Sequence, residues 1–244
     1  MLILALDTTS EHGGAAIYRG HDCLAMALNE GAADRYSVTL FELVERALAE
    51  ANLGFRDIEL YAVSKGPGSF TGIRVGLAAA QAWAKAFSKP LQAVTLLEAM
   101  VQQAQPDTDW AVPILDARRG EFFLGFYRRP GDARRNARLT SAGEGQVVRP
   151  EHLPDLLETL ARGGQCRTFS RGTIACLTRA HDLKARALRE NLSQTLTWID
   201  IPGVLLDAIA GVALEAHEQG ETSPPEELDA YYIRRPDAEM NWRA

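Results

Sequence analysis

Residues 65–76 read KGPGSFTGIRVG and join a short apolar run to a long alanine-rich segment. The run before them, residues 60–64, predicts a strand, and the glycines around Pro67 end it because proline fixes its own φ angle and glycine accepts conformations that a Cβ forbids. Thr71 is the expected N-cap of a helix over residues 72–87. The segment therefore predicts a strand, a tight loop and a helix in succession.

Two explanations of the glycines at positions 66, 68 and 72 stay open. The free N–H groups of the first helical turn, with Arg74 nearby, can hold an anion. Alternatively, the glycines only allow the strand, the loop and the helix to pack closely. The spacing matches neither the phosphate-binding G-x-x-x-x-G-K-[ST] pattern nor the dinucleotide-binding G-x-G-x-x-G pattern, so close packing is favoured.

An internal repeat organises the chain. The apolar run Leu2–Asp7 recurs as Ala111–Asp116, and at the same offset Ala16–Arg19 corresponds to Gly125–Arg128. Both copies read as a strand, a polar turn that begins with aspartate, and a returning strand. The repeat predicts a duplicated subdomain.

The order of the expected elements indicates the fold class. In the first half, strands are expected at residues 2–7, 14–18, 23–28, 60–64 and 91–94, and helices at 37–51, at 72–87 and from 95. In the second half, a hairpin over 111–127 precedes a helix after Pro150, a strand near 167–170 and a helix around 203–218. Antiparallel strands followed by βα units predict an α/β protein with two mixed-sheet subdomains. The expected boundaries are 1–105, 106–220 and a C-terminal tail, 221–244.

Composition places the chain among ordinary globular proteins. It has 244 residues, of which 46% are hydrophobic and 24% charged, with a net charge of −6. Both halves of the chain carry a net negative charge, so neither forms a basic surface for binding nucleic acid. The arginine-rich segment 128–138 is either an RNA contact or a solvated loop, and the solvated loop is favoured.

The chain shows no sign of an export or membrane segment. The widely spaced cysteines Cys23, Cys166 and Cys176 suit reduced thiols better than disulfides. The N-terminal apolar run lacks a basic lead-in and meets Asp7 too early for a signal peptide or a membrane span. We therefore expect a cytoplasmic protein without a membrane partner.

Two of the expected helices have more apolar surface than one sheet can cover. Over residues 72–87 the polar side chains of Arg74, Gln81 and Lys85 form one narrow stripe, and the remaining positions are apolar. The helix over 37–51 has a similarly broad apolar sector. The surplus is covered either by other parts of this chain or by a second chain, and both alternatives stay open.

The sequence predicts no catalytic residue, metal site or cofactor. The five histidines never fall at i, i+4, Ser69 lacks a G-x-S-x-G context, and no cysteine lies in a peptidase context. Weak candidates for a Mg²⁺-nucleotide site follow two strands: Asp7 with Thr8, and Asp116 with Arg118. Neither turn has an early glycine that lets N–H groups close on a phosphate, so turn capping by aspartate is favoured.

Four landmarks together resemble the TsaB family, the bacterial subunit of the tRNA threonylcarbamoyladenosine machinery. They are Leu4–Thr8, the segment 66–76, Asp116–Arg118 and Tyr231–Arg234. The resemblance implies a duplicated actin-like domain of the sugar kinase and heat-shock ATPase kind. It also implies a noncatalytic subunit that supports TsaD, which carries the histidine metal ligands and transfers threonylcarbamoyl to adenosine 37 of tRNAs reading codons that begin with A. The ATPase TsaE completes that assembly, and contact with tRNA is indirect.

The resemblance places the partner contact on the two N-terminal helices, and the same surface can support a homodimer. The expected partner-binding residues are Val38, Phe41, Leu48, Gly72, Arg74, Val75, Ala78, Ala79, Ala82, Trp83 and Ala86. The chain departs from the family pattern in its glycine-rich first hairpin, residues 9–14, and in the lack of a histidine before Ser37. The rival hypothesis is an ATP-dependent kinase or carbamoyl transferase that uses Asp7 and Asp116; a peptidase has the least support.

Overall fold

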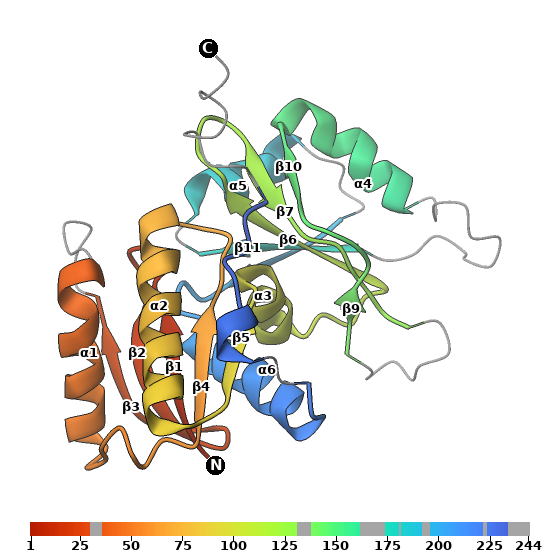
Figure 1. Cartoon of the computed structure of the whole chain (residues 1–244). Coiled ribbons are helices and arrows are strands. Elements are labelled where there is room, and N and C mark those ends of the chain that lie inside the picture. Colours follow the sequence, from red (N-terminus) through yellow and green to blue (C-terminus); the bar gives the residue numbers. More distant parts are fainter. Residues whose placement is uncertain are drawn as a thin grey trace. The chain divides into compact units, whose positions relative to one another are not determined.

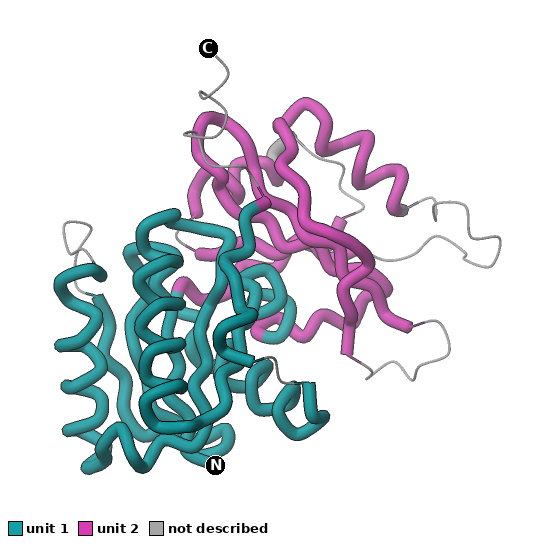
Figure 2. The backbone as a smooth tube through the Cα atoms, in the orientation of Figure 1, with its two compact units in different colours: residues 1–102, 204–232 teal, residues 103–203, 233–244 magenta. Residues whose placement is uncertain are grey.

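The computed structural model describes residues 1–29, 36–130, 138–161, 174–180, 182–191, 196–221 and 224–233. The chain forms two compact units (Figure 2). Unit 1 comprises Met1–Gln102 and Val204–Tyr232, and unit 2 comprises Gln103–Gly203 with the C-terminal residues.

Unit 1 is built on a five-stranded mixed sheet in the order β3-β2-β1-β4-β5 (Figure 1). Its strands are β1 (Leu2–Asp7), β2 (Gly14–Arg19), β3 (Asp22–Leu28), β4 (Leu60–Ser64) and β5 (Leu91–Val94). The first three strands are antiparallel, whereas β4 and β5 continue the sheet parallel to β1. The helices are α1 (Tyr36–Glu50), α2 (Phe70–Phe87), α3 (Leu96–Ala104) and α6 (Leu206–Glu218), and a short 3-10 turn, η3, spans Pro225–Glu227.

Unit 2 repeats this sheet order as β10-β7-β6-β11-β12, with a small extension made by β8 and β9. Its strands are β6 (Trp110–Asp116), β7 (Phe122–Leu124), β8 (Tyr127–Arg128), β9 (Thr140–Ser141), β10 (Gln146–Val148), β11 (Ile174–Arg179) and β12 (Thr197–Ile201). Its helical segments are η1 (Pro150–His152), α4 (Leu153–Ala161), α5 (Leu183–Ala187) and η2 (Leu188–Asn191). The matching order, antiparallel on one side of the first strand and parallel on the other, confirms the expected α/β fold with two mixed-sheet subdomains.

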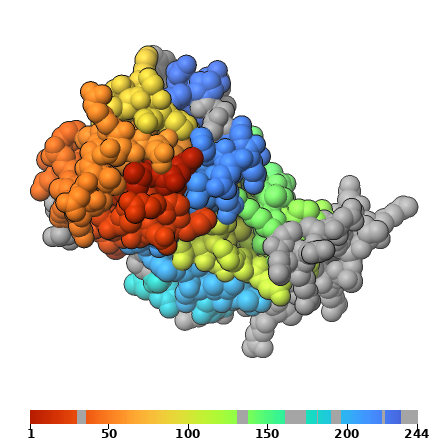
Figure 3. Space-filling view, turned by 90° about the horizontal axis from the view of Figure 1, so that it is seen from below, coloured from red at the N-terminus to blue at the C-terminus, as the bar shows by residue number. Residues whose placement is uncertain are grey.

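Helices cover both faces of the unit 1 sheet. Leu4 and Leu6 of β1 belong to the core cluster that includes α1 and α2. Ile3 and Ala5 are also fully buried, and strand alternation directs them to the other face. There α6 packs on β1, β4 and β5. Seen from below, the N-terminal strands (red) lie between the segment around residue 50 (orange) and α6 (blue) (Figure 3).

The unit boundaries differ from the three segments expected from the sequence. The helix expected near 203–218 exists as α6, but it belongs to unit 1 and not to the second subdomain. The same unit takes in the first half of the segment expected to be a tail, up to Tyr232. The chain thus returns to its first unit after completing the second sheet, a crossover that spacing along the sequence does not reveal.

Most expected elements of the first half lie within two residues of their predicted bounds, whereas the second half differs. The strand expected near 167–170 falls outside the described residues. Four strands, β9, β10, β11 and β12, were not predicted. The described cysteines Cys23 and Cys176 are free thiols, and burial raises the pKa of Cys176 to about 12. In the described part of the chain, no helix has both the length and the apolar character that crossing a bilayer requires.

Candidate functional site

The glycines of the 65–76 segment allow α2 to lie directly against the turn that follows β1. A Cβ at Gly72 would come within 2.0 Å of the carbonyl oxygen of Thr8, and one at Gly68 within 2.4 Å of the carbonyl oxygen of Thr9. A Cβ at Gly76 would lie 2.2 Å from Thr8 Oγ1. No side chain fits at such distances, so the close-packing explanation is confirmed.

The helix begins earlier than predicted. Ser69, and not Thr71, is the N-cap: its hydroxyl accepts a hydrogen bond from the Gly72 N–H at 3.2 Å. The Ser69 N–H in turn donates to the Thr9 carbonyl oxygen at 2.7 Å. A serine cap satisfies one of the free donors of the first turn, and the bond to Thr9 fixes the start of α2 against β1.

Asp7 is fully buried and acts as a turn residue. Its Oδ1 accepts hydrogen bonds from the Thr9 N–H at 2.9 Å and the Thr9 hydroxyl at 2.6 Å. Within the described residues, Asp7 Oδ2 and Thr8 Oγ1 have no hydrogen-bond partner. The two nucleotide candidates of the first repeat are therefore enclosed, and Thr8 is packed against Gly72 and Gly76 of α2.

Asp116 occupies the equivalent position in unit 2 and also caps its turn. Its Oδ1 accepts a hydrogen bond from the Arg118 N–H at 2.7 Å, and its Oδ2 lies 3.0 Å from Lys184 Nζ. Its own N–H donates to Asp182 Oδ2 at 2.7 Å, which connects β6 to the start of α5. Arg118 is exposed and has a positive φ of 61°. Each aspartate thus makes the turn contacts favoured from the sequence, and the two lie in different units.

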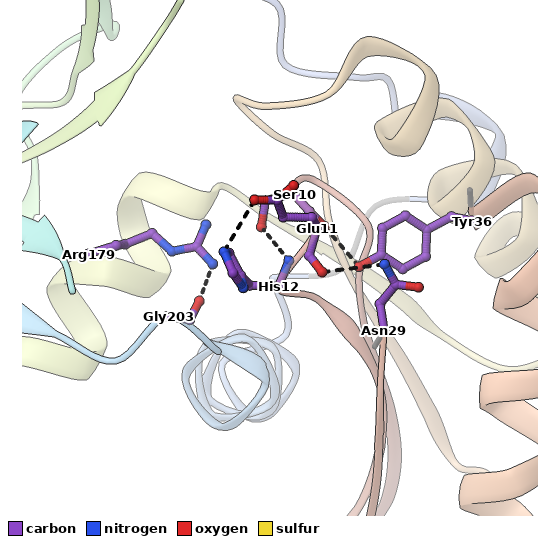
Figure 4. A network of polar contacts seen from close by, with 7 residues as sticks. All are labelled: Ser10, Glu11, His12, Asn29, Tyr36, Arg179 and Gly203. Carbon is purple, nitrogen blue, oxygen red and sulfur yellow. Dashed lines mark hydrogen bonds and ion pairs between the residues drawn. The ribbon is translucent and has the colours of Figure 1, made fainter. Parts of the chain in front are cut away.

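The first hairpin holds the beginning of α1 (Figure 4). The hydroxyl of Tyr36 donates to the Ser10 carbonyl oxygen at 2.8 Å, and Asn29 Nδ2 donates to the Glu11 carbonyl oxygen at 3.4 Å. His12 Nε2 lies 3.5 Å from Glu11 Oε1 on the exposed side of this turn. The contacts give α1 a fixed entry point beside β2 and β3. In the described ranges, no group of three or more histidine, cysteine, aspartate or glutamate side chains is placed to hold a metal ion.

The arginine-rich segment lies only partly in the described structure. Arg128 stacks at 5.7 Å on the Trp110 ring, and Arg129 donates to the carbonyl oxygens of Thr108 and Pro106. These two arginines therefore support packing within unit 2. Arg134 and Arg135 lie outside the described residues.

An exposed apolar surface covers the outer side of α1 and α2. Val38 is 77% exposed and Phe41 is 53% exposed, although both are large apolar side chains on a regular helix. Phe41 lies 6.3 Å from the Trp83 ring of α2, and both contact Phe55, at 6.1 Å and 5.1 Å respectively. Phe55 in turn stacks on Phe87 at 5.9 Å. The aromatic rings join the two helices into one continuous patch.

We call this patch the helix surface. It consists of the exposed residues Val38, Phe41, Ala78, Ala82 and Ala86 and the half-buried residues Val75, Ala79 and Trp83. Arg74 is exposed at one end of it. Two of the expected partner-binding residues do not belong to it: Leu48 is 4% exposed within the core, and Gly72 is buried against Thr8.

Sequence reasoning missed two contributions to this region. Phe55 comes from the loop after α1, where a single apolar residue after Gly54 was the only signal. The C-terminal segment 224–232 contacts α2 along its other edge. There Gln81 Nε2 donates to the carbonyl oxygens of Pro225 at 2.7 Å and Leu228 at 2.8 Å. Part of the surplus apolar surface is therefore covered by the chain itself, and the helix surface is the part left exposed.

Comparison with known proteins gives a consistent result. Residues 29–169 match the family model described as TsaD, tRNA N6-adenosine threonylcarbamoyltransferase. The Bacillus subtilis protein named tRNA threonylcarbamoyladenosine biosynthesis protein TsaB is 32% identical over 128 residues, which cover 52% of this chain and 56% of that protein. The Escherichia coli protein of the same name is 29% identical over 163 residues, covering 66% and 68%.

The solved structure of YeaZ from Pseudomonas aeruginosa has the same fold, with a TM-score of 0.69 at 21% identity over 95% of this chain and 99% of that one. The chain spans about half the length of several curated relatives that it matches. The family model covers more than half of the chain, and the resemblance drawn from the sequence landmarks is confirmed. The chain belongs to the TsaB proteins within the TsaD (tRNA N6-adenosine threonylcarbamoyltransferase) family.

Proposed function

We propose that this chain is a noncatalytic subunit that docks a TsaD-family enzyme through the helix surface. The enzyme adds threonylcarbamoyl to adenosine 37 of tRNAs reading codons that begin with A, and a TsaE-type ATPase completes the assembly. This chain contacts tRNA only through the complex. The names of its relatives support the pathway, and the helix surface supports the role in it.

The exposure of Val38 and Phe41 beside Trp83 carries the proposal. Burying apolar surface contributes roughly 25 cal/mol per Å², so a regular helix that presents such side chains to water gains stability when another surface covers them. Aromatic anchors near the centre of a patch are typical of residues that dominate association. The small side chains of Ala78, Ala82 and Ala86 allow the backbone of a partner helix to approach closely.

The contacts of the aspartates support a noncatalytic role. Asp7 is enclosed and uses Oδ1 for its own turn, while Asp116 pairs with Lys184. A Mg²⁺-nucleotide site needs carboxylates that face the ligand and N–H groups that close on the phosphates.

Nucleotide binding separates this proposal from the rival enzyme. We expect calorimetry of the isolated protein with Mg²⁺-ATP to give no saturable binding in the micromolar range. Micromolar binding that disappears in Asp7→Ala would instead support a kinase or carbamoyl transferase. Asp116→Asn, which keeps the size of the side chain and removes its charge, tests the second carboxylate in the same assay.

Self-association is expected to use the same surface when no partner is present. Because one patch cannot be buried twice, addition of the TsaD-family subunit should convert a homodimer of this chain into a heterodimer. Size-exclusion chromatography with light scattering measures the masses directly. A stable complex that retains two copies of this chain in contact through α1 and α2 would contradict a shared surface.

The docking test itself is the substitution Ala82→Arg, measured by association with the TsaD-family subunit. Ala82 is exposed, so the arginine does not disturb the core. Ala79, another of the expected partner-binding residues, is half-buried, so an arginine there could also disturb the packing of the free protein.

A further inference from the structure

Arg74 is held in one conformation by two aromatic side chains of unit 1. Its guanidinium carbon lies 3.8 Å from the centre of the Phe70 ring and 5.8 Å from the centre of the Tyr232 ring. Its Nε donates a hydrogen bond to the Tyr232 hydroxyl at 2.9 Å. The two rings lie 5.2 Å apart with an interplanar angle of 34°. The arginine is therefore fixed on one edge by a hydrogen bond and on one face by stacking.

This arrangement joins residues far apart in the sequence. Phe70 and Arg74 occupy the first two turns of α2, whereas Tyr232 ends the C-terminal segment that runs beside the helix. The Tyr231 N–H donates to the Lys65 carbonyl oxygen at 2.8 Å, which fixes that segment at the loop before α2. Phe70 itself is 39% exposed, so it contributes little to the core.

The charged end of Arg74 has no acceptor in its own chain among the described residues. Nε is the only guanidinium nitrogen with a hydrogen-bond partner there, and no carboxylate of the described ranges forms an ion pair with it. The two Nη groups provide a planar fork of N–H donors that matches a carboxylate in bidentate geometry. An arginine ordered in advance loses less side-chain entropy when it binds.

We propose that Arg74 is the polar anchor of the helix surface and receives a carboxylate side chain of the partner subunit. The proposal rests on the docking function given above and adds its specificity-determining contact. Phe70 and Tyr232 are positioning residues that hold the fork. Arg74 continues the exposed stripe of Ala78, Ala82 and Ala86 at spacings of four residues, so a chain that covers the alanines reaches the arginine as well.

The surrounding charges favour a protein carboxylate over a nucleic-acid phosphate. Backbone recognition of nucleic acid requires several cations on one face. On the described parts of α1 and α2, the exposed cations Arg46, Arg74 and Lys85 are matched by exposed Glu42, Glu45 and Glu50. These helices therefore present no net positive charge to a polyanion. A single carboxylate that lies beside the apolar patch can instead pair with Arg74, whose side chain is already ordered.

Calorimetric titration of the purified TsaD-family subunit tests the contact. We expect Arg74→Gln to weaken binding by about 30-fold or more, because the partner's carboxylate is then buried without a counter-charge. Arg74→Lys keeps the charge without the fork and is expected to lose about 5- to 10-fold. Tyr232→Phe keeps the ring and removes the hydroxyl, for an expected loss of about 3-fold. The affinity of the unaltered protein should also fall more steeply with salt than that of Arg74→Gln.

Arg19→Gln is the matched control, because Arg19 is exposed at the far end of β2, where β2 pairs with the first residues of β1. Its affinity should stay within about twofold. If the affinity of Arg74→Gln also stays within twofold of the unaltered protein while Ala82→Arg does not bind, the proposal for Arg74 is wrong. The helix surface is then still supported as the docking site. If neither substitution weakens binding, the proposed function fails as well. If Arg74→Gln weakens binding of isolated tRNA and not of the subunit, Arg74 contacts a phosphate and the proposal is overturned.

Discussion

Ala82→Arg is expected to lower the affinity for a TsaD-family subunit by about 100-fold or more, because an unpaired charge enforced inside an apolar contact costs several kcal/mol. Ala82 lies in the exposed alanine stripe of α2, one residue before Trp83. In the free protein the new side chain extends into water, and alanine and arginine differ by only a few tenths of a kcal/mol in helix propensity. Calorimetry or co-purification measures the loss.

The same substitution at Ala142 provides the control. Ala142 is an exposed alanine of unit 2, and its backbone N–H keeps its bond to the Phe126 carbonyl oxygen whatever the side chain. Ala142→Arg should bind like the unaltered protein, and both variants should keep the circular dichroism spectrum of the parent. If Ala82→Arg and Ala142→Arg are both folded and both bind as tightly as the unaltered protein, the helix surface is not the docking site.

The predictability of the fold varied with the local signals in each segment. Between residues 60 and 87, a buried strand, a glycine and proline loop and a long apolar helix each leave a strong local pattern, and β4 and α2 follow the prediction within two residues. β11 was missed although all six of its residues are buried. It ends in Thr178 and Arg179, and a charged residue at the end of a short apolar run normally indicates solvent.

Long-range packing explains the remaining differences. The helix over 206–218 was predicted, but its return to unit 1 depends on contacts with β1, β4 and β5, which no local pattern encodes. The same limit applies at the helix surface. Both Phe41 and Leu48 belong to the broad apolar sector of α1, and only the position of the sheet decides that Phe41 is exposed and Leu48 is buried. Coverage of α2 by the segment 224–232 likewise depends on residues more than a hundred positions away.

Gly72→Ala is expected to destabilise the protein by about 3 kcal/mol or more, because overpacking against a rigid backbone atom lies at the upper end of such effects. The added methyl group would lie 2.0 Å from the Thr8 carbonyl oxygen, and that backbone is held by the neighbouring turn of Asp7 and Thr9. This steric clash is relieved only if α2 moves away from β1. Urea unfolding followed by circular dichroism should show the loss as a lower midpoint.

Gly211→Ala is the matched control, since Gly211 lies inside α6 and its nearest atom to an added Cβ is Gln102 Nε2 at 3.8 Å. Because the added methyl group makes only an ordinary van der Waals contact and the backbone is helical, alanine is expected to stabilise by about 0.5–1 kcal/mol. If Gly72→Ala destabilises the protein and Gly211→Ala stabilises it, the close contact with Thr8 explains the glycine at position 72. The general cost of glycine in a helix does not explain it. If Gly72→Ala proved as stable as the parent, α2 would not need its close approach to β1, and the anion-binding explanation of the glycines would become the better one.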